Sequence, residues 1–323
     1  MFLVMTGSVR LYEYGRQKDC QDRIVNCGSK ENRLMRTKVI VNPDSKPLRI
    51  RDHLRPALHL LRHHGFHLSV SFTKGPGEVL PITRRALEQG YETIVVAGGD
   101  GTTNEAINGL FGTGVPLGIL PFGGSNVLAR ELRIPLHPVE AARVLGQKRL
   151  RKIDLGSVQG RYFSMMASCG YDAYAVSRTD GRIKKVLHRY AYIWAGLKDF
   201  VLYKPTEIEI DVDDGHFRDA GTFVVVGNAH LYGGSHEVTP FAEIDDGFLD
   251  VCIYQGKYQF GLARFAIGVL SKQHLNMRNV KYYRARKVRL SATKPTLLQV
   301  DGDVLGELPM TVEIVPGALD VFC

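Results

Sequence analysis

The chain has 323 residues, of which 44% are hydrophobic and 23% charged, a composition typical of a soluble globular protein with room for two domains. Its formal net charge of +9 favours anionic partners, which are nucleic acid, anionic lipid headgroups or nucleotide phosphates. The sequence has no zinc-finger spacing and no aromatic RNA-binding signature, and this argues against nucleic acid.

Cysteine content and hydropathy indicate the compartment. Five cysteines without a Cys-x-x-Cys pair predict reduced thiols. No stretch approaches the roughly 18 apolar residues that a spanning helix needs. We therefore expect a cytoplasmic protein that contacts the inner membrane face only peripherally.

Residues 1–35 show no clear period and are predicted to be a poorly defined extension, with the fold beginning near Met35. Residues 36–148 then alternate between strand and helix patterns. The predicted strands are 38–42, 66–72, 92–97 and 116–120, and the predicted helices are 47–64, 76–89, 102–111 and 125–133. This alternation predicts an α/β domain with a parallel, doubly wound sheet.

Residues 149–323 are dominated by strand patterns, interrupted by one helical stretch near 182–203. The predicted strands are 149–154, 161–168, 206–212, 221–228, 249–254, 286–292 and 296–301. They predict a mostly antiparallel β-sandwich, whose C-terminal end could return to the first domain. The cleft between the two halves is the default ligand site.

The first glycine turn follows a β-branched run and reads Gly98-Gly99-Asp100-Gly101. Glycines allow backbone angles that side chains forbid, and amides at the start of the next helix can hold a phosphate. Asp100 could act there through water or a metal ion. The structural alternative is an ordinary helix start, with Thr102 and Glu105 as a capping box.

A second glycine turn, 121–126, again ends a predicted strand and precedes a predicted helix. Both turns are expected at the carboxyl edge of the sheet, where ligands bind in open α/β folds. Ser125 could contact the nucleotide there. Alternatively, it serves only as the N-cap of helix 125–133.

Two acidic segments lie in the second half. Residues 239–250 carry four acidic side chains, a set of oxygen ligands that hard cations prefer, although a plain Asp-Gly turn is equally compatible. The segment Asp301-Gly302-Asp303 places two carboxylates at a tight hairpin, which taken alone is also a plain turn.

Histidine and arginine clusters have simpler explanations. His59 and His63 have the i, i+4 spacing of a metal pair, but a third ligand is not evident, and a solvated helix face is the better interpretation. Basic residues between Arg182 and Arg189 precede an apolar helical pattern. This segment could contact anionic lipid, although a core helix with a charged end is slightly favoured.

These motifs together resemble the diacylglycerol and sphingosine lipid kinase family. The resemblance rests on Gly98-Gly99-Asp100-Gly101-Thr102 with Asn104-Glu105, on Leu120-Pro121 with Asn126, on the Asp245-Asp246-Gly247 and Asp301-Gly302-Asp303 turns, and on the ending Val315-Pro316-Gly317. It runs from about residue 36 to the end and implies an ATP-dependent kinase that uses Mg²⁺. In such a kinase the first domain binds the nucleotide and the second binds a lipid, here diacylglycerol or a related glycerolipid.

The resemblance also implies roles for single residues. Asp303 occupies the position of the general base, and Asp301 and Asp100 are the other catalytic candidates. The implied nucleotide contacts are Asn42, Thr73, Gly98, Gly99, Asp100, Gly101, Thr102, Thr103, Asn104 and Ser125. The implied metal ligands are Asp246 with main-chain oxygens of Glu243 and Phe248, while Asp100 and Asp154 match a water-linked metal network.

The chain departs from the family pattern at four positions. Lys46 replaces a glycine, Gly124 a threonine, Val127 an aspartate and Asp303 a glutamate. Two alternatives therefore stay open: an enzyme like NAD kinase, whose family shares the first glycine turn, and a lipid-binding protein of the same fold that has weak or no kinase activity. The sequence leaves the lipid and the oligomeric state open, a homodimer included.

Overall fold

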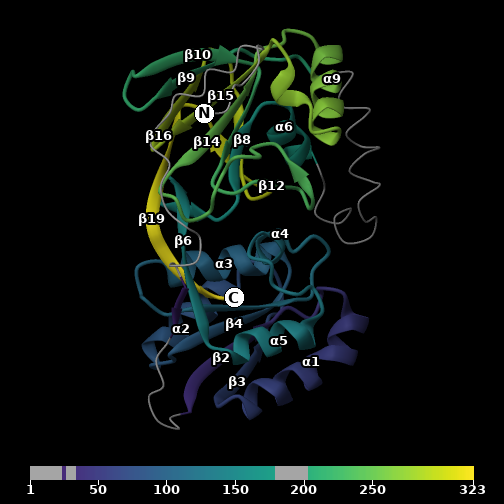
Figure 1. Ribbon diagram of the computed structural model, residues 1–323, viewed down its shortest axis with the longest axis vertical. Helices are drawn as coiled ribbons and strands as arrows, with labels where there is room; N and C mark the ends of the chain where they lie inside the picture. The colour runs from purple at the N-terminus through teal and green to yellow at the C-terminus, as the bar shows by residue number, and fades with distance from the viewer. Residues whose placement is uncertain (1–23, 27–33, 179–202) are drawn as a thin grey trace, which may run out of the picture.

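The computed structural model describes residues 24–26, 34–178 and 203–323. Figure 1 shows two stacked parts, with α1 to α5 in the lower part and most of the later strands in the upper part. The predicted extension 1–35 and the basic segment 182–189 lie almost entirely outside the described residues. Within the described part, no helix combines the length and apolar character needed to cross a membrane.

The first domain contains four parallel strands in the order β3-β2-β4-β5. Helices α1 and α5 pack together, as do α2 and α3. The elements are β2 (Met35–Val41), α1 (Pro47–His63), β3 (Phe66–Phe72), α2 (Val79–Glu88), β4 (Thr93–Gly98), α3 (Asp100–Leu110), β5 (Leu117–Pro121), α4 (Val127–Glu131) and α5 (Pro138–Gly146). The predicted doubly wound sheet is confirmed, and α5 is the helix that the pattern did not predict.

The second domain is built from two antiparallel layers that share a core of buried aliphatic side chains. One layer has the order β15-β14-β11-β8-β17-β18, and the other contains β10, β9, β16, β19 and β6. Its strands are β6 (Arg149–Val158), β7 (Arg161–Phe163), β8 (Met166–Cys169), β9 (Ile208–Val212), β10 (Phe217–Gly221), β11 (Phe223–Gly227), β12 (Leu231–Tyr232), β13 (His236–Glu237), β14 (Leu249–Tyr254), β15 (Val280–Ala285), β16 (Lys287–Ala292), β17 (Leu297–Val300), β18 (Asp303–Glu307) and β19 (Met310–Phe322). The predicted sandwich is confirmed.

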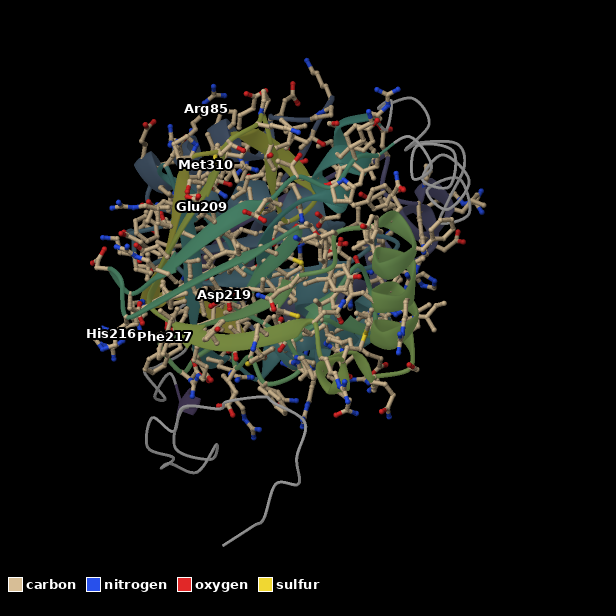
Figure 2. The ribbon with its side chains drawn as sticks, turned by 90° about the horizontal axis from the view of Figure 1, so that it is seen from above. Arg85, Glu209, His216, Phe217, Asp219 and Met310 are labelled. Atoms are coloured by element: carbon tan, nitrogen blue, oxygen red, sulfur yellow. The ribbon has the colours of Figure 1, made fainter. Side chains whose placement is uncertain are left out.

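Three helical segments and a short strand complete the described chain. They are α6 (Tyr171–Arg178), α9 (Gln259–Leu270), the 3-10 helix η1 (His274–Asn276) and β1 (Ile24–Asn26), which pairs with β6. In the view from above, the turn between β9 and β10 carries His216 and Phe217 to one edge of the upper domain, and α9 lies at the opposite edge (Figure 2).

One strand predicted over 161–168 is in fact two strands in different sheets. β7 pairs with β6, whereas β8 pairs with β11 and β17. The chain turns between them because the main-chain N–H groups of Ser164, Met165 and Met166 all point to the carboxylate of Asp301. A distant side chain therefore decides where this strand ends.

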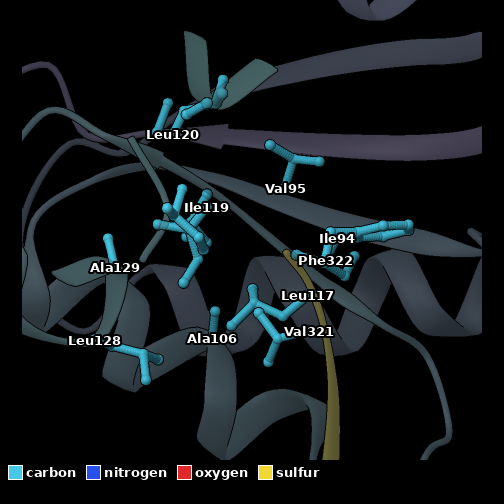
Figure 3. Packing of buried hydrophobic residues seen from close by; sticks show 14 of the residues in the cluster. Ile94, Val95, Ala106, Leu117, Ile119, Leu120, Leu128, Ala129, Val321 and Phe322 are labelled. Carbon is cyan, nitrogen blue, oxygen red and sulfur yellow. The ribbon is translucent and has the colours of Figure 1, made fainter. Parts of the chain in front are cut away.

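The 13-residue strand β19 belongs to both domains. It pairs with β16 and β6 in the upper domain, and near its end Val321 pairs with Leu117 of β5. Figure 3 shows Val321 and Phe322 packed among the buried side chains of the first domain, beside Leu117 and Ile94. One sheet thus passes continuously from the first domain into the second.

Candidate active site

The ends of strands β4 and β5 are brought into direct backbone contact by their glycine turns. The N–H of Gly123 donates to the carbonyl of Gly98 at 3.0 Å. A methyl group at Gly123 would lie 2.4 Å from the Cα of Gly99 and 2.6 Å from the side-chain oxygen of Asn126. Only glycine at position 123 permits this approach, so the two turns form one continuous backbone surface at the carboxyl edge of the sheet.

This contact predicts that two neighbouring glycines respond differently to substitution. Gly123→Ala should lower the free energy of unfolding by about 1–3 kcal/mol, the usual cost of forcing an extra carbon into a packed site. Gly124→Ala is the matched control, because a methyl group at Gly124 would have nothing within 4 Å. Urea unfolding compares the two variants, and equal effects would show that the contact between the turns does not constrain the fold.

Asp100 joins the same two turns through its side chain. As the first residue of α3, it accepts the main-chain N–H groups of Asn126 at 3.0 Å and Val127 at 2.6 Å. Burial raises the pKa of this carboxyl, while the two N–H groups oppose the rise. The carboxylate therefore fixes the second turn against the first.

The start of α4 differs from the interpretation of Ser125 as its N-cap. The N-cap residue is Asn126, which has a left-handed backbone (φ 48°) and whose side-chain amide bonds both the N–H and the carbonyl of Gly123. Ser125 is partly exposed, and its carbonyl accepts from Arg130 Nε. The Ser125 side chain is thus not used to cap the helix.

The capping box proposed for Thr102 and Glu105 is also not formed. Helix α3 begins at Asp100, so both residues lie inside the helix. Glu105 instead accepts the N–H groups of Gly77 and Val79, each at 2.9 Å, and holds the start of α2. Thr102 Oγ1 accepts from Asn42 Nδ2 at 3.2 Å, which brings the end of β2 to the first glycine turn.

The other predicted nucleotide contacts differ in how open they are. Gly101 has open space around it. Thr73 and Thr103 are buried, with their hydroxyls 3.5 Å and 3.1 Å from the carbonyls of Val41 and Gly99. Asn104 is buried beside Asn108. The structure thus gathers Asn42, Gly98, Gly99 and Thr102 at one place, while the nucleotide-binding roles themselves stay predictions.

The hairpin at Asp301 and Gly302 separates the two candidate carboxylates. Asp301 has a left-handed backbone (φ 46°), and its carboxylate accepts N–H groups of the segment between β7 and β8. Burial raises its pKa to about 6 against these hydrogen bonds, and the negative charge of Asp100 adds to the rise. Asp303 is exposed and lies 3.4 Å from Arg161. Asp301 is therefore an anchor, whereas the Asp303 carboxylate is open to solvent, and its role as a base stays a prediction.

A buried polar cluster beside this hairpin was not predicted from the sequence. Gly302 N–H donates to Gln299 Oε1 at 2.7 Å, and Gln299 Nε2 contacts Ser168 Oγ and, at 3.3 Å, Asp172. Asp172 also accepts from Ser168 and Tyr232. Burial raises the pKa of Asp172. The cluster connects α6 to the hairpin, but its members come from distant parts of the chain, and no motif signals it.

A pocket of about 640 Å³ lies between the two domains. It is bounded by α2 and α3 on one side and by the turn from β6 to β7 on the other, and its lining includes Arg84, Asn108, Phe111, Arg161 and Tyr162. Because Arg161 also contacts Asp303, the pocket adjoins the acidic hairpin.

The acidic loop does not form the expected cage of side chains. Asp245 pairs with Arg151, Asp246 pairs with Arg284, and the Glu243 side chain is exposed. Asp154 accepts the N–H groups of Gly247 and Gly317, each at 2.6 Å. Within the described ranges, no group of three or more His, Cys, Asp or Glu side chains could hold a metal ion, and this includes His59 and His63.

Arg284 supplies the positive charge beside Asp246. Its guanidinium lies 4.5 Å from the centre of the Phe248 ring, and Phe248 N–H donates to the other oxygen of Asp246 at 2.9 Å. Burial raises the pKa of Asp246 to about 6, although Arg284 opposes this. The loop donors thus do not fit a resident divalent ion while Arg284 is paired, and the assignment of Glu243, Asp246 and Phe248 as ligands stays a prediction.

The pairing predicts how stability responds to magnesium. We expect the unmutated protein to melt at the same temperature with chelator and with Mg²⁺, because Arg284 already neutralises Asp246. Arg284→Gln should lower the melting temperature by several degrees, since it leaves a partly buried carboxylate without its partner. The same variant should gain stability from Mg²⁺ by mass action. A magnesium-dependent rise in the unmutated protein would instead support the ligand set predicted from the sequence.

The fold and these turns define a class of two-domain protein, in which a parallel α/β domain with paired glycine turns faces a β-sandwich that carries an acidic hairpin. Residues 36–158 match the model of the diacylglycerol kinase catalytic domain, and residues 165–323 match the YegS C-terminal NAD kinase beta sandwich-like domain. The chain therefore belongs to the diacylglycerol kinase-like family, as the sequence motifs indicated.

Individual proteins agree with these models. The chain is 29% identical to the diacylglycerol kinase of Bacillus subtilis over 279 residues, which is 85% of this chain and 92% of that protein. It is 29% identical to the diacylglycerol kinase of Staphylococcus saprophyticus over 276 residues, 85% of this chain and 90% of that protein. The crystal structure of a diacylglycerol kinase from Bacillus anthracis superposes with a TM-score of 0.71 at 22% identity, covering 89% of this chain and 96% of the other. That likeness shows a shared fold.

Proposed function

We propose that this protein is a kinase that transfers the γ-phosphoryl group of ATP to the hydroxyl of a lipid, with diacylglycerol or a related glycerolipid as the acceptor. Relatives that are named diacylglycerol kinase support the assignment of this chain as a lipid kinase. The first glycine turn leads directly into helix α3, and main-chain N–H groups at a helix start suit the phosphates of a nucleotide.

The connection between the nucleotide turn and the acidic hairpin is the observation that carries this proposal. Asn108 of helix α3, which starts at the first glycine turn, exchanges two hydrogen bonds of 2.9 Å with the main chain of Tyr162. Two residues later, Ser164 begins the segment that is held by Asp301. One short stretch of chain therefore fixes the hairpin against the helix that would hold the phosphates.

These positions support the following transfer. The lipid oxygen forms a bond to the γ-phosphorus, the bond from that phosphorus to the bridging β,γ-oxygen breaks, and ADP leaves. The hydroxyl proton passes to the carboxylate of Asp303 and then to solvent. Arg161 orients Asp303. A Mg²⁺ ion that enters with ATP would neutralise phosphate charge when bound.

The rival interpretation is a lipid-binding protein without turnover, and two residues motivate it. Val127 is buried where related enzymes carry aspartate, and Gly124 presents no side chain. The Val127 N–H still bonds Asp100, however, so the turn keeps its shape without the extra carboxylate. We therefore favour the enzyme.

The direct test is incubation of the protein with labelled ATP, Mg²⁺ and separate acceptors, namely diacylglycerol, sphingosine, phosphatidylglycerol and NAD⁺. Labelled phosphate on a glycerolipid is the expected result. Labelling of NAD⁺ alone would identify a NAD kinase. ATP binding without labelling of any acceptor would support the lipid-binding protein.

A further inference from the structure

Helix α9 presents an apolar face to solvent. Its inner side, with Leu262, Phe265 and Val269, packs on the outer face of the second sheet. The outer side leaves large hydrophobic side chains uncovered: Tyr258 is 77% exposed, Phe260 86%, Ile267 64% and Leu270 63%. Scattered exposed hydrophobic residues are ordinary. Here, however, three on one helix and a fourth just before it form a patch of the kind that marks an interaction site.

The stretch of sequence that contains α9 is strongly basic. The 50 residues from Val251 to Val300 contain ten Lys and Arg and no Asp or Glu. Lys257 and Arg264 are exposed within or beside the patch, and Lys272 follows the helix, where it pairs with Glu237 at 2.7 Å. We name the set Lys257, Tyr258, Phe260, Arg264, Ile267 and Leu270 the α9 surface.

Among the described residues, α9 lies where a large flat partner could approach it. Figure 1 shows α9 in the upper domain, away from the first domain, and Figure 2 shows it at one edge. The turn of a helix places Phe260, Arg264 and Ile267 on one side, because residues four and seven apart lie on nearly the same face. Apolar side chains therefore alternate with a cation along a single outward line.

We propose that the α9 surface docks the protein on an anionic lipid bilayer. Phe260 and Ile267 enter the boundary between headgroups and acyl chains, Tyr258 lies at the headgroup level, and Lys257 and Arg264 meet lipid phosphates. The proposal rests on the proposed function, because an acceptor with two acyl chains lies in a bilayer and the enzyme must reach it there. It places membrane contact on described residues, separate from the basic segment 182–189.

Vesicle sedimentation of the full chain tests the docking. The unmutated protein should sediment with vesicles containing phosphatidylglycerol, bind phosphatidylcholine vesicles more weakly, and lose binding as salt is raised. The double variant Phe260→Ser and Ile267→Ser should reduce binding at least tenfold, and Arg264→Gln should reduce it about fivefold, the ratio that corresponds to about 1 kcal/mol per basic residue. Leu48→Ser is the matched control, because Leu48 is 69% exposed but lies on α1 of the first domain.

Two further measurements separate docking from other roles of the same face. A double variant that binds vesicles normally overturns the proposal. The proposal is also overturned if light scattering shows that the unmutated protein is a dimer and the double variant a monomer, because a second copy would then cover the α9 surface. A large fall in melting temperature without loss of vesicle binding would also overturn it, since the face would then be covered by the chain itself.

Turnover distinguishes failure of docking from failure of the proposed function. The double variant should phosphorylate a short-chain diacylglycerol that dissolves in water at the normal rate, and should lose turnover only when the acceptor is in vesicles. If no lipid is phosphorylated but vesicle binding depends on Phe260 and Ile267, the docking proposal stands and the proposed function fails.

Discussion

Replacing Asp303 with asparagine should reduce phosphate transfer by about 10²–10⁴-fold, the usual contribution of a positioned general base. ATP affinity should change little, because Asp303 lies on the hairpin of the second domain and acts mainly in the transition state. The stability should also hold, since this side chain is exposed and its contact with Arg161 is a surface ion pair. Single-turnover kinetics with the acceptor identified in the labelling experiment measure the effect.

Two further variants separate the role of Asp303 from that of Asp301. Asp303→Glu restores the residue usual in related kinases and should keep measurable activity. Asp301→Asn should instead destabilise the protein, because a single amide oxygen cannot accept all the N–H groups that converge on Asp301. If Asp303→Asn transfers phosphate at the normal rate in a protein that binds ATP, the base is another group.

Asp100→Asn should reduce turnover by about two or more orders of magnitude, as for other changes to a phosphate-binding element. The amide keeps the size of the side chain, but its NH₂ group must face either the Asn126 or the Val127 N–H, and two donors repel. The second turn should therefore shift relative to the first. The Michaelis constant for ATP should rise and kcat should fall, and steady-state kinetics at varied ATP measure both.

A melting curve is the control for that variant. We expect a fall of several degrees, from the loss of one charge-assisted hydrogen bond at a buried site. Normal turnover in a folded Asp100→Asn protein would show that Asp100 is not part of the active site. If Asp100→Asn does not fold, Asp100→Glu is the variant to measure.

The fold of the first domain could be predicted because its signals are local. β4 and β5 are largely apolar runs that are buried along their whole length. β4 ends at Gly98, and β5 ends at Pro121, two residues before Gly123. The sequence showed that Lys46 departs from the family pattern, but not which backbone conformation this residue has. Lys46 has a left-handed backbone (φ 53°), a conformation that glycine adopts without strain.

The details of the site could not be predicted because they depend on contacts between distant residues. The sequence placed Asp100 beside phosphate, but its two N–H partners lie 26 and 27 residues away. Counting carboxylates in the acidic loop suggested a cation cage, and the arginines that pair with Asp245 and Asp246 come from β6 and β15. Similarly, Gln299 reaches Ser168 across 131 residues of sequence. A short motif shows which side chains are present, but not which of them already form an ion pair or hydrogen bond within the protein.

The path of β19 has a consequence for how the protein is made. In the described chain, the edge of β5 is completed by Val321 of β19, so a ribosome must synthesise the chain as far as β19 before the sheet of the first domain can close. Until then the nascent chain carries an open apolar edge, which is prone to pair with other chains. Loss of Val321 and Phe322 should therefore destabilise the first domain, although Leu117 lies more than 200 residues before them in the sequence. Both domains are thus expected to reach their final form together, once β19 has been synthesised.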